Sequence, residues 1–287
     1  MKDIIKETQD KTYLNWSVSK TSPGTPGTFL KAEEGKGDKK VYYKLSQYDP
    51  VKGIVGHECV NEIIAGRLLD ILGAEHLEYQ LQHAKIIINE KEYDTWICAS
   101  RNFRRNDETK ITLESLYDKE HQSQEERLAF SERIGIGDYI YNMLIIDYLI
   151  LNRDRHGANI ELLKNNKTGE IRPAPYFDHG LSLLWTCEND EDIQKYDVLE
   201  DKFANNYIGS RSTYDNLALI PADKLPDIKP LTQENKEYLM KDLEGILSSL
   251  LLNKIIEMID QRIKEYGIFY NQRQSGNPKQ NSRLSDL

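Results

Sequence analysis

Two polar loops that flank a short hairpin constrain this sequence more than any other feature. Residues 152–159 (NRDRHGAN) directly follow an almost continuously apolar segment, 137–151, which predicts a buried helix. Residues 160–177 then predict a strand, an Asn-Lys-Thr-Gly turn and a second strand. Asp178 comes next, in a second polar loop (YFDHG). The sequence therefore predicts a buried helix, a polar loop, a hairpin and another polar loop, in that order.

The two loops carry the side chains that phosphoryl transfer requires. One carboxylate must orient the attacking hydroxyl and accept its proton, while a second carboxylate and an amide oxygen hold Mg²⁺ against the nucleotide phosphates. Asp154 suits the first role, and Asn159 and Asp178 suit the second as metal ligands. Either motif alone occurs by chance, because Asp and Asn favour loops. Their order around a hairpin, after a buried helix, favours the catalytic interpretation.

Other residues near these loops allow two interpretations. His156 could be a base or a metal ligand, but a lone loop histidine more often makes a structural hydrogen bond, which we prefer. Arg153 and Arg155 could contact phosphate or form ion pairs, and the sequence favours neither. The tyrosines of 139–148 lie at helical spacing, which predicts core packing and not base stacking.

The order of predicted elements indicates an α+β fold with two lobes. Strands are predicted at 41–45, 84–90 and 93–100, and a helix at 57–72 that ends at Gly73. Later helices are predicted at 124–134, 137–151, 233–252 and 253–266. We expect a small strand-rich N-lobe at 1–101, a larger, mainly helical C-lobe at 102–270, and a polar tail at 271–287.

Charge and cysteine content exclude several classes of protein. The formal net charge of −9 argues against a general nucleic-acid binder. Cys59, Cys98 and Cys187 are far apart and include no C-x-x-C pair, which predicts buried reduced thiols. The N-terminus lacks a long apolar run, and the apolar stretch 139–151 is interrupted by polar residues. We expect a cytoplasmic protein with no membrane or direct nucleic-acid partner.

The motif D-R-H-x-x-N with the later D-H-G-L-S resembles the catalytic core of the HipA-like Ser/Thr kinases, which are related to the phosphoinositide 3-/4-kinase-like fold. Residues 41–44 (VYYK) resemble the strand that bears the ATP-binding lysine of this family. Residues 61–62 (NE) with the following RLLDILG resemble its N-lobe helix, and 96–103 resemble its hinge strand. The resemblance runs from about residue 17 to 265 and is most specific over 152–182. It implies a two-lobed protein-kinase-like fold.

The resemblance also implies an ATP site in the N-lobe. Lys44 would bridge the α- and β-phosphates as a point charge, and Glu62 would hold this lysine in place. Glu58, one helical turn earlier, is the competing partner. The hinge lacks the usual acidic residue of the family, so backbone groups of Cys98 to Ser100 would bind the adenine. ATP and Mg²⁺ are the expected cofactors.

A segment rich in Ser, Thr, Gly and Pro precedes the predicted strand of Lys44. Residues 22–28 (SPGTPGT), with Gly24 and Gly27, could close over the phosphates through backbone N–H groups. No Gly-Lys-Ser/Thr follows, so this is not a Walker A loop. The equivalent loop of HipA-like kinases can be autophosphorylated. The candidate positions here are Ser19, Thr21, Ser22, Thr25 and Thr28.

We therefore expect an ATP-dependent kinase that phosphorylates a Ser/Thr hydroxyl of a protein of unknown identity. A phosphoinositide-type lipid or small-molecule kinase is one alternative, although no basic amphipathic segment supports membrane binding. A nucleotide-binding pseudokinase is another, and a DNA-associated regulatory protein is disfavoured by the charge. Residues 185–232 follow Asp178 as an activation segment would, and we expect them to form part of the acceptor face. HipA toxins carry an additional N-terminal subdomain for which this chain has no room. It therefore resembles the short stand-alone members, and an antitoxin partner is doubtful.

Overall fold

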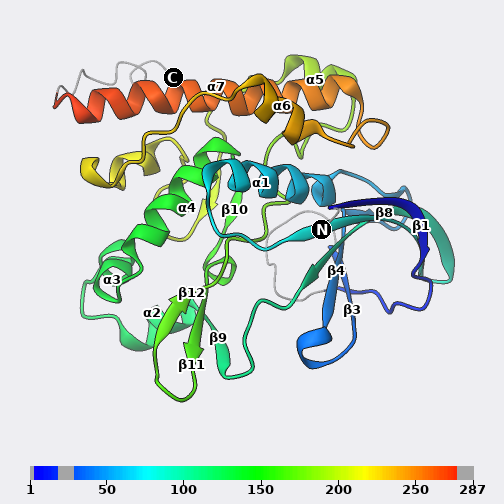
Figure 1. The fold of residues 1–287 in the computed structure, drawn as a ribbon, viewed down its shortest axis with the longest axis horizontal. Coiled ribbons are helices and arrows are strands. Elements are labelled where there is room, and N and C mark those ends of the chain that lie inside the picture. Colours follow the sequence, from blue (N-terminus) through cyan, green and yellow to red (C-terminus); the bar gives the residue numbers. More distant parts are fainter. Residues whose placement is uncertain (1–2, 19–28, 277–287) are drawn as a thin grey trace.

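The computed structural model describes residues 3–18 and 29–276, which form two lobes (Figure 1). A six-stranded sheet with the order β1-β7-β8-β4-β3-β2 dominates the N-lobe. The strands are β1 (Ile4–Asp10), β2 (Ser17–Val18), β3 (Leu30–Glu34), β4 (Val41–Leu45), β7 (Tyr79–Ile88) and β8 (Lys91–Arg101). Strand β1 runs parallel to β7, and the other neighbours are antiparallel.

The two faces of this sheet belong to different cores, because successive side chains of a strand point to opposite faces. Cys98 of β8 packs into the main core together with helix α1 (Glu58–Leu72). Its neighbours Ile97 and Ala99 pack into a second cluster on the other face. Helix α1 ends where Gly73 adopts φ 68°, a left-handed cap that glycine favours. This end is the one predicted from the sequence.

Helices make up most of the C-lobe. Helix α4 lies at its centre, and α7 runs along the upper edge of the molecule in Figure 1. The C-lobe helices are α2 (Leu113–Glu120), α3 (Arg127–Arg133), α4 (Gly137–Leu149), α5 (Asp190–Lys195), α6 (Gln233–Met240) and α7 (Ser249–Gln274). Helix α4 is apolar nearly all round and buried, as the sequence predicts. Short 3₁₀ helices are η1 (Gly37–Lys39), η2 (Gly157–Asn159), η3 (Asp215–Leu219) and η4 (Ala222–Lys224).

Small sheets position the two polar loops. The predicted hairpin is β11 (Glu161–Asn165) and β12 (Ile171–Pro173), and β9 (Glu108–Thr112) extends it to three strands. The short strand β10 (Asp154–Arg155) pairs in parallel with β13 (Asn205–Asn206). A two-stranded sheet of β5 (Tyr48–Asp49) and β6 (Gly53–Ile54) lies in the N-lobe segment between β4 and α1. The loop with Asp154 is thereby tied to a segment about fifty residues downstream.

Several predicted boundaries were wrong. The two helices predicted at 233–252 and 253–266 are divided elsewhere, because residues 241–248 leave the helix, with Asp242 and Gly245 at positive φ. Helix α7 continues through Gln274, so the helical C-lobe extends into the segment predicted as a polar tail. Ser248 caps the start of α7 with its side chain.

Two further observations concern the helices and the cysteines. Within the ranges 3–18 and 29–276, no helix has an apolar stretch long enough to cross a bilayer. All three cysteines are buried and unpaired, which confirms the prediction of free thiols.

Candidate active site

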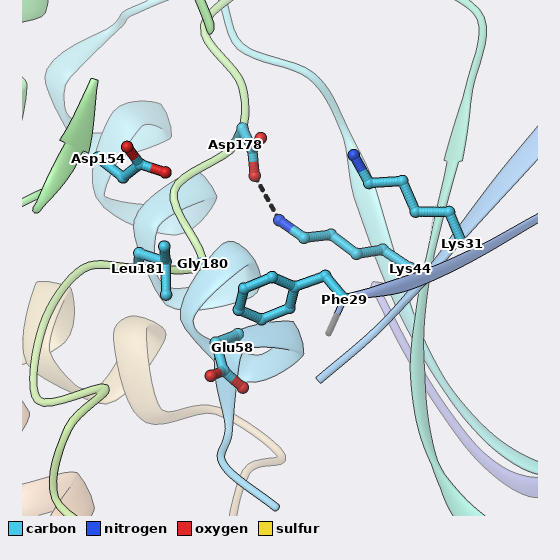
Figure 2. A pocket seen from close by; sticks show the side chains of 8 residues that line it. All are labelled: Phe29, Lys31, Lys44, Glu58, Asp154, Asp178, Gly180 and Leu181. Carbon is cyan, nitrogen blue, oxygen red and sulfur yellow. Dashed lines mark hydrogen bonds and ion pairs between the residues drawn. The ribbon is translucent and has the colours of Figure 1, made fainter. Parts of the chain in front are cut away.

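A pocket opens between the N-lobe sheet, α1 and the two polar loops (Figure 2). The residues that line it are Phe29, Lys31, Lys44, Glu58, Asp154, Asp178, Gly180 and Leu181. Three of the predicted site residues, Lys44, Asp154 and Asp178, therefore meet in one cavity. They come from three segments that are far apart in the sequence.

Lys44 lies at the centre of this arrangement. Strand alternation sends Tyr43 and Leu45 into the second core cluster and leaves Lys44 on the pocket side. Its Nζ donates to Glu62 Oε1 at 2.8 Å and also to Asp178 Oδ1. Burial would lower the pKa of Lys44, but the charges of Asp178 and Glu62 outweigh it and hold the pKa well above the ordinary value. The structure thus pairs Lys44 with Glu62, and Glu58 is not the partner.

Hydrogen bonds from α1 position the loop that carries Asp178. Glu62 Oε2 accepts the backbone N–H of His179 at 2.8 Å. Asn61 Nδ2 donates to the carbonyls of Gly180 at 2.9 Å and Ser182 at 3.0 Å. A Cβ at Gly180 would lie 3.3 Å from Lys44 Nζ, so glycine permits this close approach. The helix therefore orients both the lysine and the loop opposite it.

Asp178 has an unusual backbone conformation, with φ 61°. Asp is one of the residues that tolerate this left-handed region, which is sparsely populated and often found at functional sites. Its N–H lies 3.3 Å from the hydroxyl of Tyr79. Burial would raise the pKa of Asp178, but the nearby charges of Lys44 and Lys31 hold it below the usual range. The carboxylate is therefore ionised, as a metal ligand must be.

The loop with Asp154 is held by its own amide side chains. Asn152 Oδ1 accepts the N–H of Asp154 at 3.2 Å. Asn159 Nδ2 donates to the Asp154 carbonyl at 3.0 Å, which leaves the amide oxygen of Asn159 to act as a ligand. The described residues contain no cluster of three or more His, Cys, Asp or Glu suited to a metal. The donor types nevertheless suit Mg²⁺, because it usually takes one or two protein oxygens together with phosphates and waters. Of the two residues, Asp178 lines the pocket.

Arg155 forms an ion pair inside the protein, which is one of the two roles that the sequence allowed for it, the other being a phosphate contact. It is buried and forms an ion pair with Asp147 of α4 at 2.8 Å. It also donates to the carbonyls of Asn159 at 3.2 Å and Phe177 at 3.0 Å, and its Nη2 lies 3.2 Å from His179 Nδ1. Arg155 thus joins α4 to both polar loops.

We predict that Arg155→Met lowers the free energy of unfolding by about 3 to 5 kcal/mol, because it leaves the buried Asp147 carboxylate without its partner. Urea unfolding followed by circular dichroism measures the change. Arg153→Met is the control, since this side chain is less buried and its Nε donates to the Phe203 carbonyl. Equal small losses in both variants would contradict the structural role of Arg155.

His156 lies beside Asp154, with its Nε2 3.9 Å from Asp154 Oδ2. This separation is beyond hydrogen-bonding range. The structure therefore places this ring at ion-pair distance from the predicted base, without a hydrogen bond between them.

The predicted adenine contact does not fit the structure. Strand β8 lies between β7 and β4, so Cys98 and Ser100 are paired on both sides in the sheet. Their backbone groups are used by the neighbouring strands. Residues 102–107, which join β8 to β9 and the two lobes, are the first segment beyond that pairing. Gly24, Gly27 and the candidate autophosphorylation positions lie outside the described residues.

Sequence reasoning missed Lys31 and Phe29. Lys31 lies directly opposite Lys44 on the adjacent strand, and both line the pocket. Like charges that face each other across a sheet are destabilising unless an anion lies between them. The alternating apolar residues Leu30 and Ala32 could have predicted that Lys31 points to the opposite face of the sheet. The sequence does not give the strand register, so it could not have predicted that Lys31 lies opposite Lys44.

We predict that Lys31→Met weakens the binding of a phosphate-bearing ligand in this pocket by about tenfold, because one charge-assisted contact would be lost. Equilibrium titration of the protein with ATP as the probe ligand measures this change. Lys40→Met is the control, since this lysine pairs with Glu33 on the same hairpin but does not line the pocket. A Lys31→Met variant with an unchanged affinity would contradict a phosphate contact by this residue.

Comparison with known proteins identifies the fold. No protein-family model matches the sequence, and no curated protein matches it. The structure of the proinflammatory kinase CtkA of Helicobacter pylori superposes with a TM-score of 0.64 at 16% identity, over 93% of this chain and 99% of that one. The chain has a kinase-like fold. The fold expected from the HipA-like resemblance is thus confirmed.

A second kinase-like structure, HipA in its complex with HipB and operator DNA from Shewanella oneidensis MR-1, is more distant. It has a TM-score of 0.44 at 14% identity, over 89% of this chain and 60% of that chain.

Within the kinase-like fold, the sheet and α1 form the N-lobe, and Asp154 and Asp178 lie on the side of the pocket formed by the polar loops.

Proposed function

We propose that this chain is an ATP- and Mg²⁺-dependent kinase that transfers the γ-phosphoryl group to a Ser or Thr hydroxyl of a protein. One observation carries the proposal. Glu62 and Asp178 hold Lys44 in a pocket that also contains Asp154. A paired lysine, a metal-binding carboxylate and a separate base are the parts that phosphoryl transfer needs.

In the proposed reaction, Lys44 and Lys31 bind phosphate oxygens, and Glu62 keeps Lys44 in position. Mg²⁺ bound to Asn159 and Asp178 would neutralise charge on the phosphates. Asp154 orients the acceptor hydroxyl and accepts its proton as the acceptor oxygen bonds to the γ-phosphorus. The bond from the γ-phosphorus to the bridging oxygen breaks, and ADP leaves. Most of the rate gain would come from positioning and charge stabilisation.

The acceptor class can be tested directly. The purified chain is incubated with Mg²⁺ and γ-labelled ATP, with dephosphorylated casein in one arm and phosphatidylinositol vesicles in another. We expect label on Ser or Thr of casein or of the chain itself, shown by acid hydrolysis, and none when EDTA removes the metal. Label in the lipid alone would contradict a protein acceptor. Nucleotide binding without transfer would contradict the kinase and indicate a pseudokinase.

We also propose a cytoplasmic location, which three buried unpaired cysteines support. The partner we propose is a protein substrate, and we propose no direct nucleic-acid or membrane partner.

A further inference from the structure

Asn205 approaches Asp154 from a segment that follows the Asp178 loop in the sequence. The two residues are register partners in the parallel pair β10 and β13. The Asn205 N–H donates to the Arg153 carbonyl at 2.8 Å, and the Tyr207 N–H donates to the Arg155 carbonyl at 2.9 Å. Backbone hydrogen bonds on both sides therefore fix Asn205 next to Asp154.

The side chains of this pair are joined by one hydrogen bond. Asn205 Nδ2 donates to Asp154 Oδ1 at 3.0 Å. A carboxylate only accepts hydrogen bonds, so chemistry requires the amide nitrogen to face Asp154. The other oxygen, Oδ2, is 3.9 Å from His156 Nε2, beyond hydrogen-bonding range. One oxygen of the proposed base is thus hydrogen-bonded to Asn205. Oδ2 has His156 at ion-pair distance only, so it can accept a hydrogen bond from a hydroxyl.

The segment around Asn205 is itself anchored. The Phe203 carbonyl accepts from Arg153 Nε, and the Ala204 N–H donates to the Arg211 carbonyl at 2.8 Å. The adjacent Asn206 side chain instead accepts from the N–H groups of residues 208 and 209, at 2.9 and 3.0 Å. Asn206 therefore stabilises its own turn, whereas Asn205 directs its amide at the base.

We propose that Asn205 is a positioning residue for the phosphoryl-transfer reaction. It fixes the orientation of the Asp154 carboxylate, so that Oδ2 faces the acceptor hydroxyl. This inference rests on the proposed kinase function and adds a residue from the expected acceptor face, 185–232. A side chain that orients a catalytic group in this way typically changes activity by about 10- to 100-fold.

Because this hydrogen bond is exposed, its effect on the reaction rate can be measured apart from any effect on the stability of the fold. Asn205 is exposed, so its bond contributes little to folding, and its replacement should leave the unfolding transition nearly unchanged. A loss of rate in a fully folded variant would then report on the orientation of Asp154.

The test compares Asn205→Ala with Asn205→Asp, with casein and γ-labelled ATP as substrates. Asn205→Ala should lower kcat by about 10- to 100-fold at unchanged KM for ATP. Asn205→Asp, although isosteric, should be slower still, because it replaces the donor with a charge that repels Asp154. A purely structural role predicts the reverse order, since Asp preserves the shape. Asn166→Ala is the control, because this exposed Asn accepts a 2.8 Å bond from Thr109 away from the pocket.

The outcomes separate the two proposals. An active wild-type enzyme with equal kcat in Asn205→Ala would overturn the role of Asn205 and leave the kinase function intact. Absence of transfer by the wild type would overturn the kinase function. In that case a crystal structure of Asn205→Ala tests whether Asn205 positions Asp154. We expect the Asp154 carboxylate to rotate in this variant. An unchanged Asp154 rotamer would contradict the positioning role.

Discussion

Asp178→Asn is expected to lower kcat by about 10³-fold, because it removes the charged oxygen that would hold Mg²⁺ against the phosphates. The fold should survive, since Asn also tolerates the left-handed φ of 61° found at this position. Lys44 also keeps its second partner, Glu62 Oε1, at 2.8 Å. Initial rates at rising Mg²⁺ concentration, with thermal unfolding in parallel, measure both effects.

Asp242→Asn is a matched control for this prediction. Asp242 has the same φ of 61°, but it is exposed and pairs with Lys6 at 3.8 Å, outside the pocket. Its kcat should equal that of the wild type. An Asp178→Asn enzyme that retains the rate of the control would show that Asp178 does not act as a metal ligand.

Elements with strong local signals were predicted well from the sequence. Strand β4 and helix α1 have the predicted positions, because β-rich composition and a glycine cap are local features. Strand β1 was missed, since its position depends on parallel pairing with a distant strand, β7. The break between α6 and α7 was predicted at 252/253 but lies at residues 241–248, where Gly245 was a usable signal.

In the site, too, residues within one motif could be predicted from the sequence, whereas contacts between distant segments could not. The motif predicted that Asp154 and Asp178 lie close together, and both line the pocket. Asn159 is held next to them through its bond to the Asp154 carbonyl. The sequence could not decide which glutamate pairs with Lys44, because Glu58 and Glu62 lie one helical turn apart and only the packing of α1 distinguishes them. Lys31 and Asn205 could not be inferred, since strand register and a parallel contact across about fifty residues bring them to the pocket region.

Asp154→Asn is expected to lower kcat by about 10²- to 10⁴-fold, because the amide cannot accept the proton of the acceptor hydroxyl. The structure should change little, since the oxygen of the new amide can still accept from Asn205 Nδ2. ATP affinity should also be preserved, as Lys44 and Lys31 keep their positions. A kcat loss without a change in KM for ATP distinguishes a lost base from a damaged nucleotide site.

The most direct measurement is the transfer of label from γ-labelled ATP to casein, with wild type, Asp154→Asn and Asp242→Asn assayed side by side. Nucleotide affinity is measured in the same preparations by titration with a fluorescent ADP analogue. We predict transfer by the wild type and Asp242→Asn, almost none by Asp154→Asn, and equal affinity in all three. Full transfer by Asp154→Asn, or no transfer by the wild type, would contradict a kinase site built on Asp154.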